Sequence, residues 1–360
     1  MARWRAAPPK PEMRNEASII ARLSRIIPSR SGVRPSGDVP LGIGDDAAVI
    51  VGRPGFVTVL STDAFVEGAH FLASVHPPHA IGYKALARAV SDLAAMGAAP
   101  RYFLLTLALP AGKTGAWLDA FARGMARAAR RFGMRLIGGD VSRHDRVFAA
   151  LTVIGEARRG RVLTRSGARP GDALYVTGRL GAAQDGLELL LREGPRAIPR
   201  RAGSYSLQRH LYPDPRLAIG AWLAASKLAS AAMDISDGLS TDLGRLCAAS
   251  RAGAVVHASA LPAVSDTRPG ARRKPAHHED GAELRRAMHG GEDYELLFTV
   301  PRRLASRVPP RFRGVSLTRI GEIIPRRGVV LLDAAGQSRP LRPLGWDHFA
   351  SSSTDAPRRV

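Results

Sequence analysis

The stretch Gly42-Ile43-Gly44-Asp45-Asp46 places two carboxylates beside glycines, directly before the apolar run of residues 47–51. One Gly-Asp pair is only a turn signal, but carboxylates beside glycine, serine or threonine recur along this chain. The further elements are Ser61-Thr62-Asp63, Ser91-Asp92, Gly138-Gly139-Asp140, Asp234-Ile235-Ser236-Asp237-Gly238 and Gly290-Gly291-Glu292-Asp293. Mg²⁺ binds carboxylate and water oxygens and usually lies between carboxylates and substrate phosphates. The pattern therefore predicts a site with several magnesium ions for a phosphorylated substrate.

The acids are expected at the ends of apolar runs in a chain where strands and helices alternate. Ligand sites of α/β sheets tend to lie at strand ends, so this placement favours one shared site. Expected strands are residues 47–51, 56–60, 102–109, 135–137, 147–156, 173–177, 255–256, 294–300, 315–324 and 329–332. Apolar spacing predicts helices over residues 16–27, 77–96, 117–132, 181–191, 217–228 and 239–249.

Length and composition predict about two domains, because 360 residues with 45% hydrophobic content exceed one ordinary core. We expect a tail over residues 1–12, an N-terminal domain over 13–158, a C-terminal domain over 159–350 and a tail over 351–360. The basic, weakly hydrophobic insertion at residues 265–281 is expected to be disordered. Translation starting at Met13 instead of Met1 is an open alternative.

The single cysteine, Cys247, excludes an internal disulfide and any multi-cysteine metal site. It favours a reducing compartment, so a cytoplasmic location is expected. No apolar stretch approaches the roughly 20 residues that cross a bilayer.

The net charge of +22 raises nucleic-acid binding as an alternative from another functional class. The arginines are spread along the chain, apart from short runs such as Arg130-Arg131 and Arg272-Arg273-Lys274, and no aromatic residues interleave with them. Net charge specifies function weakly, but an excess of this size steers anionic ligands inward.

Other catalytic classes lack their motifs: the sequence has no P-loop, no Gly-x-Ser-x-Gly elbow and no His-Glu-x-x-His zinc motif. Residues 42–47 fit a loosened dinucleotide fingerprint, yet that motif places a pyrophosphate at a helix N-terminus. Here two carboxylates stand at that point and a strand is expected to follow, so bare phosphate would be repelled.

The motifs GIGDDAAVI, STDAFVEGAHF, SDLAAMGAAP, IGGD, LTRSGARPGD, DISDGLSTDLG and GGEDYELLFTV occur in this order. Together they resemble the thiamine-monophosphate kinase family of the aminoimidazole-ribonucleotide synthetase superfamily, from about residue 16 to residue 349. The resemblance implies an α+β fold of two domains, an N-terminal domain that dimerises and a C-terminal α/β domain. It also implies a homodimer. From the spread of the charges and the lack of a long apolar stretch, we expect no specific nucleic-acid partner and no membrane partner.

The resemblance implies roles for particular residues. Magnesium ligands would be Asp46, Ser61, Thr62, Asp63, Asp92, Asp140, Asp234 and Asp237. ATP contacts would be Gly139, Arg165 and Ser236, and thiamine-phosphate contacts would be His70, Glu292 and Trp346. From the residues alone, Trp346 is also compatible with an ordinary core aromatic. Val141 departs from the family, which often has a hydroxyl residue after Gly-Gly-Asp.

The implied reaction transfers a phosphoryl group from ATP to thiamine monophosphate, directly and in line. The attacking phosphate has a second pKa of about 6 and is largely ionised at neutral pH, so no general base or nucleophile is expected. Alternatives are another ATP-dependent synthetase of the superfamily, a basic nucleic-acid-binding protein, and a sensor that binds Mg-nucleotide without consuming it.

Overall fold

The structure, a computed structural model, describes residues 16–27, 50–264 and 281–347. The Asp45-Asp46 pair, both tails and nearly all of the basic insertion lie outside these ranges. The first sheet has the strand order β1-β4-β2-β3. Its strands are β1 (Phe56–Val66), β2 (Ala99–Leu109), β3 (Arg135–Arg143) and β4 (Phe148–Arg158).

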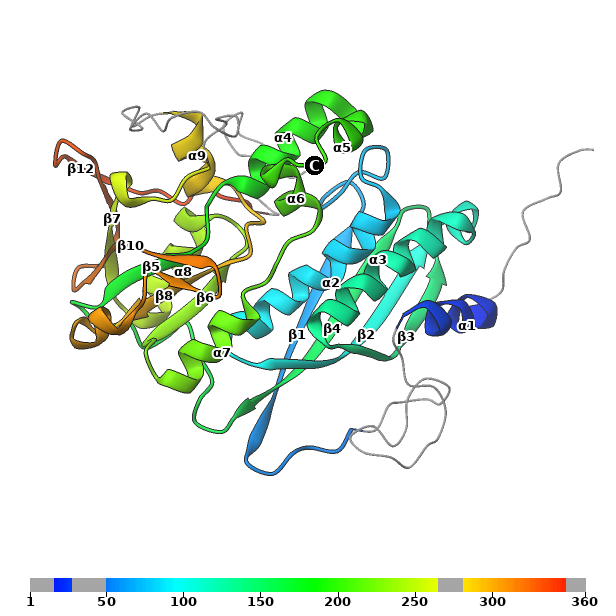
Figure 1. Ribbon diagram of the computed structural model, residues 1–360, viewed down its shortest axis with the longest axis horizontal. Coiled ribbons are helices and arrows are strands. Elements are labelled where there is room, and N and C mark those ends of the chain that lie inside the picture. Colours follow the sequence, from blue (N-terminus) through cyan, green and yellow to red (C-terminus); the bar gives the residue numbers. More distant parts are fainter. Residues whose placement is uncertain (1–15, 28–49, 265–280, 348–360) are drawn as a thin grey trace, which may run out of the picture.

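Two long helices, α2 (Pro78–Ala95) and α3 (Ala116–Phe132), pack together and cover one face of this sheet (Figure 1). Glycine makes their close approach possible. A Cβ atom at Gly82 would lie 2.0 Å from the Phe121 carbonyl oxygen, and one at Gly124 would lie 1.8 Å from that of His79. Helix α1 (Glu16–Ile26) adds Ile19 and Leu23 to the same core.

The second sheet has the order β12-β11-β7-β10-β5-β8-β6, and β9 pairs with β10. Its strands are β5 (Ala173–Thr177), β6 (Ala231–Ile235), β7 (Gly253–His257), β8 (Glu295–Val300), β9 (Arg311–Phe312), β10 (Val315–Ile324), β11 (Gly328–Leu332) and β12 (Ser338–Pro340). The helices of this half are α4 (Ala182–Glu193), α5 (Ala197–Arg200), α6 (Tyr205–Leu211), α7 (Leu217–Ser226), α8 (Leu239–Ser250) and α9 (Ala282–His289).

Helix α2 belongs to both halves of the molecule. Its residues Ala94 and Ala95 enter a second core with α7 and strands of the second sheet. The approach is close, because a Cβ atom at Gly220 of α7 would lie 1.9 Å from the Ala94 carbonyl oxygen. In Figure 1, α2 runs between the first sheet and α7. Helix α2 is therefore one of the elements on which a site at the junction of the two halves can be built.

The expectation that the acids follow strand ends is wrong for Asp63 and Asp140. Strand β1 pairs with β4 without interruption from Phe56 to Val66, so Asp63 lies in its interior, and Asp140 lies inside β3. Backbone pairing with a long neighbouring strand outweighs the weak strand propensity of aspartate. Strand β6, which contains Asp234, was not expected from the sequence.

The described helices include none that is both long enough and apolar enough to cross a membrane.

Candidate active site

A row of polar side chains runs along α2 at intervals of four residues: Lys84, Arg88 and Asp92. Residues four apart share one face of a helix, and this face is buried: Lys84 is 2% exposed and Arg88 is 7% exposed. We call these three residues the polar stripe. Of these three residues, only Asp92 was expected at the site from the sequence. The signal for the other two was the four-residue spacing on a helix that is otherwise apolar.

Three aspartates from three elements meet near the end of the stripe, and we call them the acid cluster: Asp63 of β1, Asp92 of α2 and Asp234 of β6. The register places Asp63 on the same face as Leu151, which is buried in the core with α2. The hydroxyl group of Ser61 donates a hydrogen bond to Asp92. The structure thus brings together acids that are 171 positions apart in sequence (234 − 63).

The acid cluster is under electrostatic strain. Burial and then the charge of Asp63 raise the pKa of Asp92, although Ser61 and Arg165 act in the opposite direction. Burial and then Asp92 raise the pKa of Asp234 well above its ordinary value. Like charges held in a poorly solvated place disfavour ionisation. A bound cation would relieve this repulsion, so the chemistry of these residues fits divalent metal ions.

The described residues contain no group of three His, Cys, Asp or Glu side chains arranged around one ion position. The fit is therefore to ions that each take one or two carboxylates and complete their shell with water and phosphate oxygens, as Mg²⁺ does. Asp46, the predicted ligand in the first motif, lies outside the described ranges. Arg165, a predicted ATP contact, is close enough to Asp92 to lower its pKa.

Asp237 follows β6 and is held at the start of α8. Arg245 donates to its carboxylate, and the backbone N–H groups of Ser236 and Asp237 donate to Asp242, at 3.0 and 2.9 Å. Burial and then Asp237 raise the pKa of Asp242 to about 6. The loop that carries the predicted residues Ser236 and Asp237 is therefore held in place by side chains of the helix that follows it, α8.

Thr62, Gly139 and Asp140 are not brought to the acid cluster within this chain. Asp140 is aligned through Thr106 and Ala150 with Ala64 of β1, on the face opposite to Asp63. Strands β1 and β3 are the two edges of the sheet, three strand spacings or about 14 Å apart. Within one chain, Thr62 and Asp140 therefore belong to a separate surface. Gly139 aligns with Asp63 through Leu105 and Leu151, but it lies on the opposite edge strand of the sheet.

The predicted substrate residues lie around the same junction. Glu292 is 4% exposed, and its backbone N–H donates to the Ser236 carbonyl at 2.8 Å. The backbone N–H of Trp346 donates to the Asp237 carbonyl at 2.9 Å, so both residues flank the loop after β6. His70 is 5% exposed and accepts a hydrogen bond at Nδ1 from the Val66 N–H at 3.0 Å.

The carboxylate of Glu292 is buried against the first residue of the polar stripe. Lys84 Nζ lies 2.6 Å from Glu292 Oε2 and 3.5 Å from His210 Nδ1, and His210 Nε2 lies 2.9 Å from His76 Nε2. Burial and then the charge of Lys84 lower the pKa of His76 to about 4 and that of His210 well below its ordinary value. Both imidazoles are therefore neutral near pH 7.

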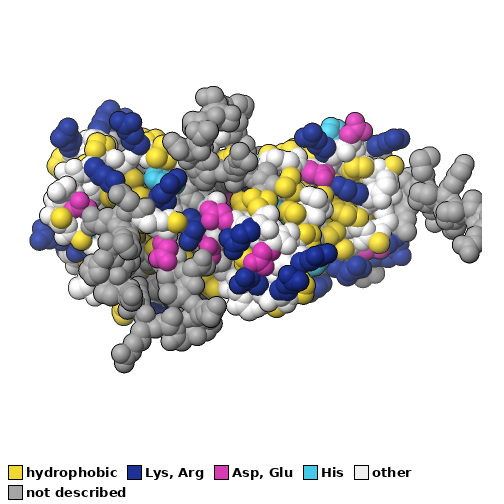
Figure 2. All heavy atoms as spheres, turned by 90° about the horizontal axis from the view of Figure 1, so that it is seen from above, with side chains coloured by type: hydrophobic (Ala, Val, Ile, Leu, Met, Phe, Trp, Pro, Cys, Tyr) yellow, Lys and Arg dark blue, Asp and Glu magenta, His cyan; other side chains and the backbone are white. Residues whose placement is uncertain are grey.

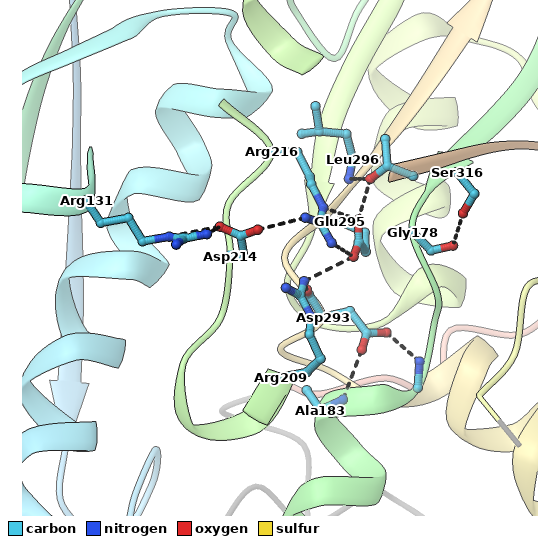
Figure 3. Close-up of polar contacts among 12 residues, drawn as sticks. Arg131, Gly178, Ala183, Arg209, Asp214, Arg216, Asp293, Glu295, Leu296 and Ser316 are labelled. Atoms are coloured by element: carbon cyan, nitrogen blue, oxygen red, sulfur yellow. Dashed lines mark hydrogen bonds and ion pairs between the residues drawn. The ribbon is translucent and has the colours of Figure 1, made fainter. Parts of the chain in front are cut away.

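A second set of charges, the ion network, has a buried centre at Glu295, Arg209 and Arg216 and continues through Asp214 to the exposed Arg131 (Figure 3). Glu295 is fully buried and accepts from Arg209 at 3.1 Å, from Arg216 Nε at 2.6 Å and from the Thr177 hydroxyl at 2.6 Å. Arg216 also donates to Asp214 at 3.0 Å, and Asp214 lies 2.5 Å from Arg131 of α3. This network links the two halves through pairs of opposite charge.

The chain matches the models of the AIR synthase related protein N-terminal domain at residues 44–157 and C-terminal domain at residues 169–333. The thiamine-monophosphate kinase of Escherichia coli K12 is 40% identical over 93% of this chain and 98% of its own. A solved thiamine-monophosphate kinase from Stenotrophomonas maltophilia has a TM-score of 0.72 at 35% identity, over 87% of this chain and 94% of its own.

A second solved structure, described as AaThiL complexed with AMPPCP and TMP, has a TM-score of 0.71 at 33% identity. It covers 83% of this chain and 89% of its own. The predicted α+β fold with two domains of this superfamily is confirmed. The similarity to the Escherichia coli enzyme extends over almost the whole of both chains. The chain therefore belongs to the thiamine-monophosphate kinase family.

Proposed function

We propose that this chain transfers the γ-phosphoryl group of ATP to thiamine monophosphate, giving ADP and thiamine diphosphate. The observation that carries the proposal is the acid cluster, in which Asp63, Asp92 and Asp234 meet at the junction of the two halves. Family membership supports the reaction class, and a relative has been solved with AMPPCP and TMP. A cytoplasmic location stays a prediction from the cysteine content.

The chain's own residues would bind the metal ions and both substrates, align the reacting phosphates and help to neutralise their charge. The acid cluster, with Asp237 beside it, would hold Mg²⁺, which neutralises phosphate charge and aligns the transferring group. The planar guanidinium group of Arg165 would bind the nucleotide phosphates in a bidentate way. His70, Glu292 and Trp346 would orient thiamine monophosphate. The acceptor phosphate has a second pKa of about 6 and attacks without a general base.

We also propose that the active form is a homodimer joined through the exposed face of the first sheet. We define this face by Leu60, Thr62, Ala64 and Asp140, which are all exposed. Leu60 is 62% exposed, and a second copy packed on this face would bury it. Since Asp140 and Asp63 are held apart within one chain, a second copy is the simplest way to complete a site that uses both.

A chemical assay tests the function. Purified chain is incubated with Mg-ATP and thiamine monophosphate, and the products are identified by mass. Thiamine diphosphate formed in step with ADP supports the proposal. ATP hydrolysis without thiamine diphosphate contradicts it, as does nucleotide binding without turnover.

The nucleic-acid alternative has its own test. Figure 2 shows Lys and Arg side chains dispersed over the visible face instead of gathered in one patch. Steeply salt-dependent binding to duplex DNA, together with no Mg-dependent ATP turnover, would favour that alternative.

Mixing two inactive variants tests the shared site. Asp63→Asn and Asp140→Asn chains are purified separately, mixed, and allowed to exchange subunits. A mixed dimer keeps one site with both natural aspartates if each site combines Asp63 of one copy with Asp140 of the other. Recovery of activity on mixing supports the proposal, and continued inactivity of verified mixed dimers contradicts it.

A further inference from the structure

We propose that Lys84 is a positioning residue of this site: its ion pair with Glu292 holds residues 290–294 against α2 and so keeps Asp234 beside Asp63 and Asp92. The inference depends on the proposed function only in taking the acid cluster as the magnesium site. Lys84 itself lies about two helical turns before Asp92 on α2 and acts through Glu292.

The ion pair is strong and directional because it is buried. The side chain of Lys84 is 2% exposed and that of Glu292 is 5% exposed, with 2.6 Å between Nζ and Oε2. Charges in a poorly solvated place attract each other more strongly than they do in water. The neighbouring imidazoles of His210 and His76 are neutral, because burial lowers the pKa of each, so among these three side chains only Lys84 brings positive charge to the carboxylate.

The segment that Glu292 anchors is bonded directly to the strand that carries Asp234. The N–H of Glu292 donates to the Ser236 carbonyl at 2.8 Å, and that of Tyr294 donates to the Ile235 carbonyl at 2.9 Å. Glu292 and Tyr294 have left-handed φ angles of 68° and 49°. Such conformations cost free energy in residues other than glycine and persist only where the surroundings hold them. A shift of Glu292 therefore moves the end of β6.

The next residue of the polar stripe fixes the other side of the cluster. Arg88 Nη1 donates to the Ala64 carbonyl of β1 at 3.3 Å, and its guanidinium group lies 5.1 Å from the centre of the Phe65 ring. Ala64 follows Asp63 directly. Thus α2 holds the second half through Lys84 and the first sheet through Arg88, and it also supplies Asp92 to the acid cluster.

The test measures magnesium-dependent binding of AMPPCP, a non-hydrolysable ATP analogue, by calorimetry. The full-length variants are Lys84→Met, Glu292→Gln and the double variant. Each single variant is expected to raise the Mg²⁺ concentration for half-maximal binding by about 10-fold to 100-fold, as loss of residues that orient metal ligands does. The double variant is expected to match the singles, because both remove the same contact.

Arg131→Met is the matched control, since it removes an ion pair between the same two halves away from the cluster. Its Mg²⁺ requirement is expected to equal that of the natural chain. An unchanged Mg²⁺ requirement in Lys84→Met, even with a lower thermal midpoint, overturns the inference. Should Lys84→Met fail to fold, an unchanged requirement in the nearly isosteric Glu292→Gln overturns it equally.

The outcome is separable from that of the proposed function. AMPPCP binding is measured without thiamine monophosphate, so a chain that binds the nucleotide but fails to make thiamine diphosphate still gives a clear result for Lys84. If the increase in the Mg²⁺ requirement of the double variant equals the product of the two single increases, the side chains act independently. That result also overturns the inference.

Discussion

The ion network and the acid cluster lie at the same junction and are both largely buried, yet their charges are balanced in opposite ways. In the ion network, the carboxylate of Glu295 receives two guanidinium groups and a hydroxyl group. In the acid cluster, burial and a neighbouring aspartate raise the pKa values of Asp92 and Asp234. One set is neutralised by the chain itself, whereas the other calls for an external cation.

The difference separates structural charge pairs from the acids of the proposed metal site. Burying an ion is tolerable when its partners replace the lost water, and the ion network meets that condition with residues of this chain. A group of acids that repel one another costs stability, and such strain with perturbed pKa values is typical of functional sites. Substitutions in the two regions should therefore have opposite consequences for stability and activity.

The largest effect is expected from Asp63→Asn. Turnover should fall by about 100-fold or more, as when one preorganised electrostatic group is removed from an active site. The thermal midpoint should not fall, because a repelling charge is removed from beside Asp92. Steady-state kinetics and calorimetry measure the two quantities. Loss of folding with unchanged specific activity of the soluble fraction would contradict the assignment.

Glu295→Gln should show the reverse pattern. It leaves Arg209 and Arg216 buried with less opposing charge, which should cost about 3–5 kcal/mol of unfolding free energy. Urea unfolding measures this loss, and the Mg²⁺ requirement of nucleotide binding should stay unchanged. Glu193→Gln, whose partner Arg201 is exposed, is the control and should leave stability unaltered. An equal loss in both variants would remove the distinction between buried and surface pairs.

A smaller, pH-dependent effect is expected from Asp293, which accepts from the N–H groups of Gly181 and Ala183 at the start of α4. Burial raises its pKa from 3.8 to about 7, despite these two bonds. Between these values the unfolded chain loses the proton first, so this residue makes stability fall as pH rises from about 4 to 7. Asp293→Asn should flatten that slope in urea unfolding at several pH values. An identical slope in the variant would show that another group causes the dependence.

The smallest effect is expected from Arg131→Met. The side chain of Arg131 is 53% exposed and its partner Asp214 also pairs with Arg216. Exposed pairs contribute little, so the loss should stay below about 1 kcal/mol. Thermal unfolding measures it. A loss as large as that of Glu295→Gln would mean that the whole network acts as one unit.

The spacing of apolar residues predicted much of the fold, because the periodicity of a helix or a strand is a property of residues close together in sequence. The expected helix over residues 117–132 matches α3 (Ala116–Phe132), and the expected strand over residues 173–177 matches β5. Strand β6, with the sequence AAMDI, was missed, since its small residues and its carboxylate give little strand signal. Lys84 was missed because lysine is rarely buried unless it is paired.

The sequence by itself determined the family resemblance and predicted which acids share one site, because residue types and their local spacing carry that information. Only the tertiary structure decided how those acids are grouped. Alternation along paired strands sends Asp63 and Asp140 to opposite faces of one sheet. Contact between distant segments gives Lys84 its partner Glu292. Both outcomes depend on packing between residues far apart in the chain, which local spacing does not specify.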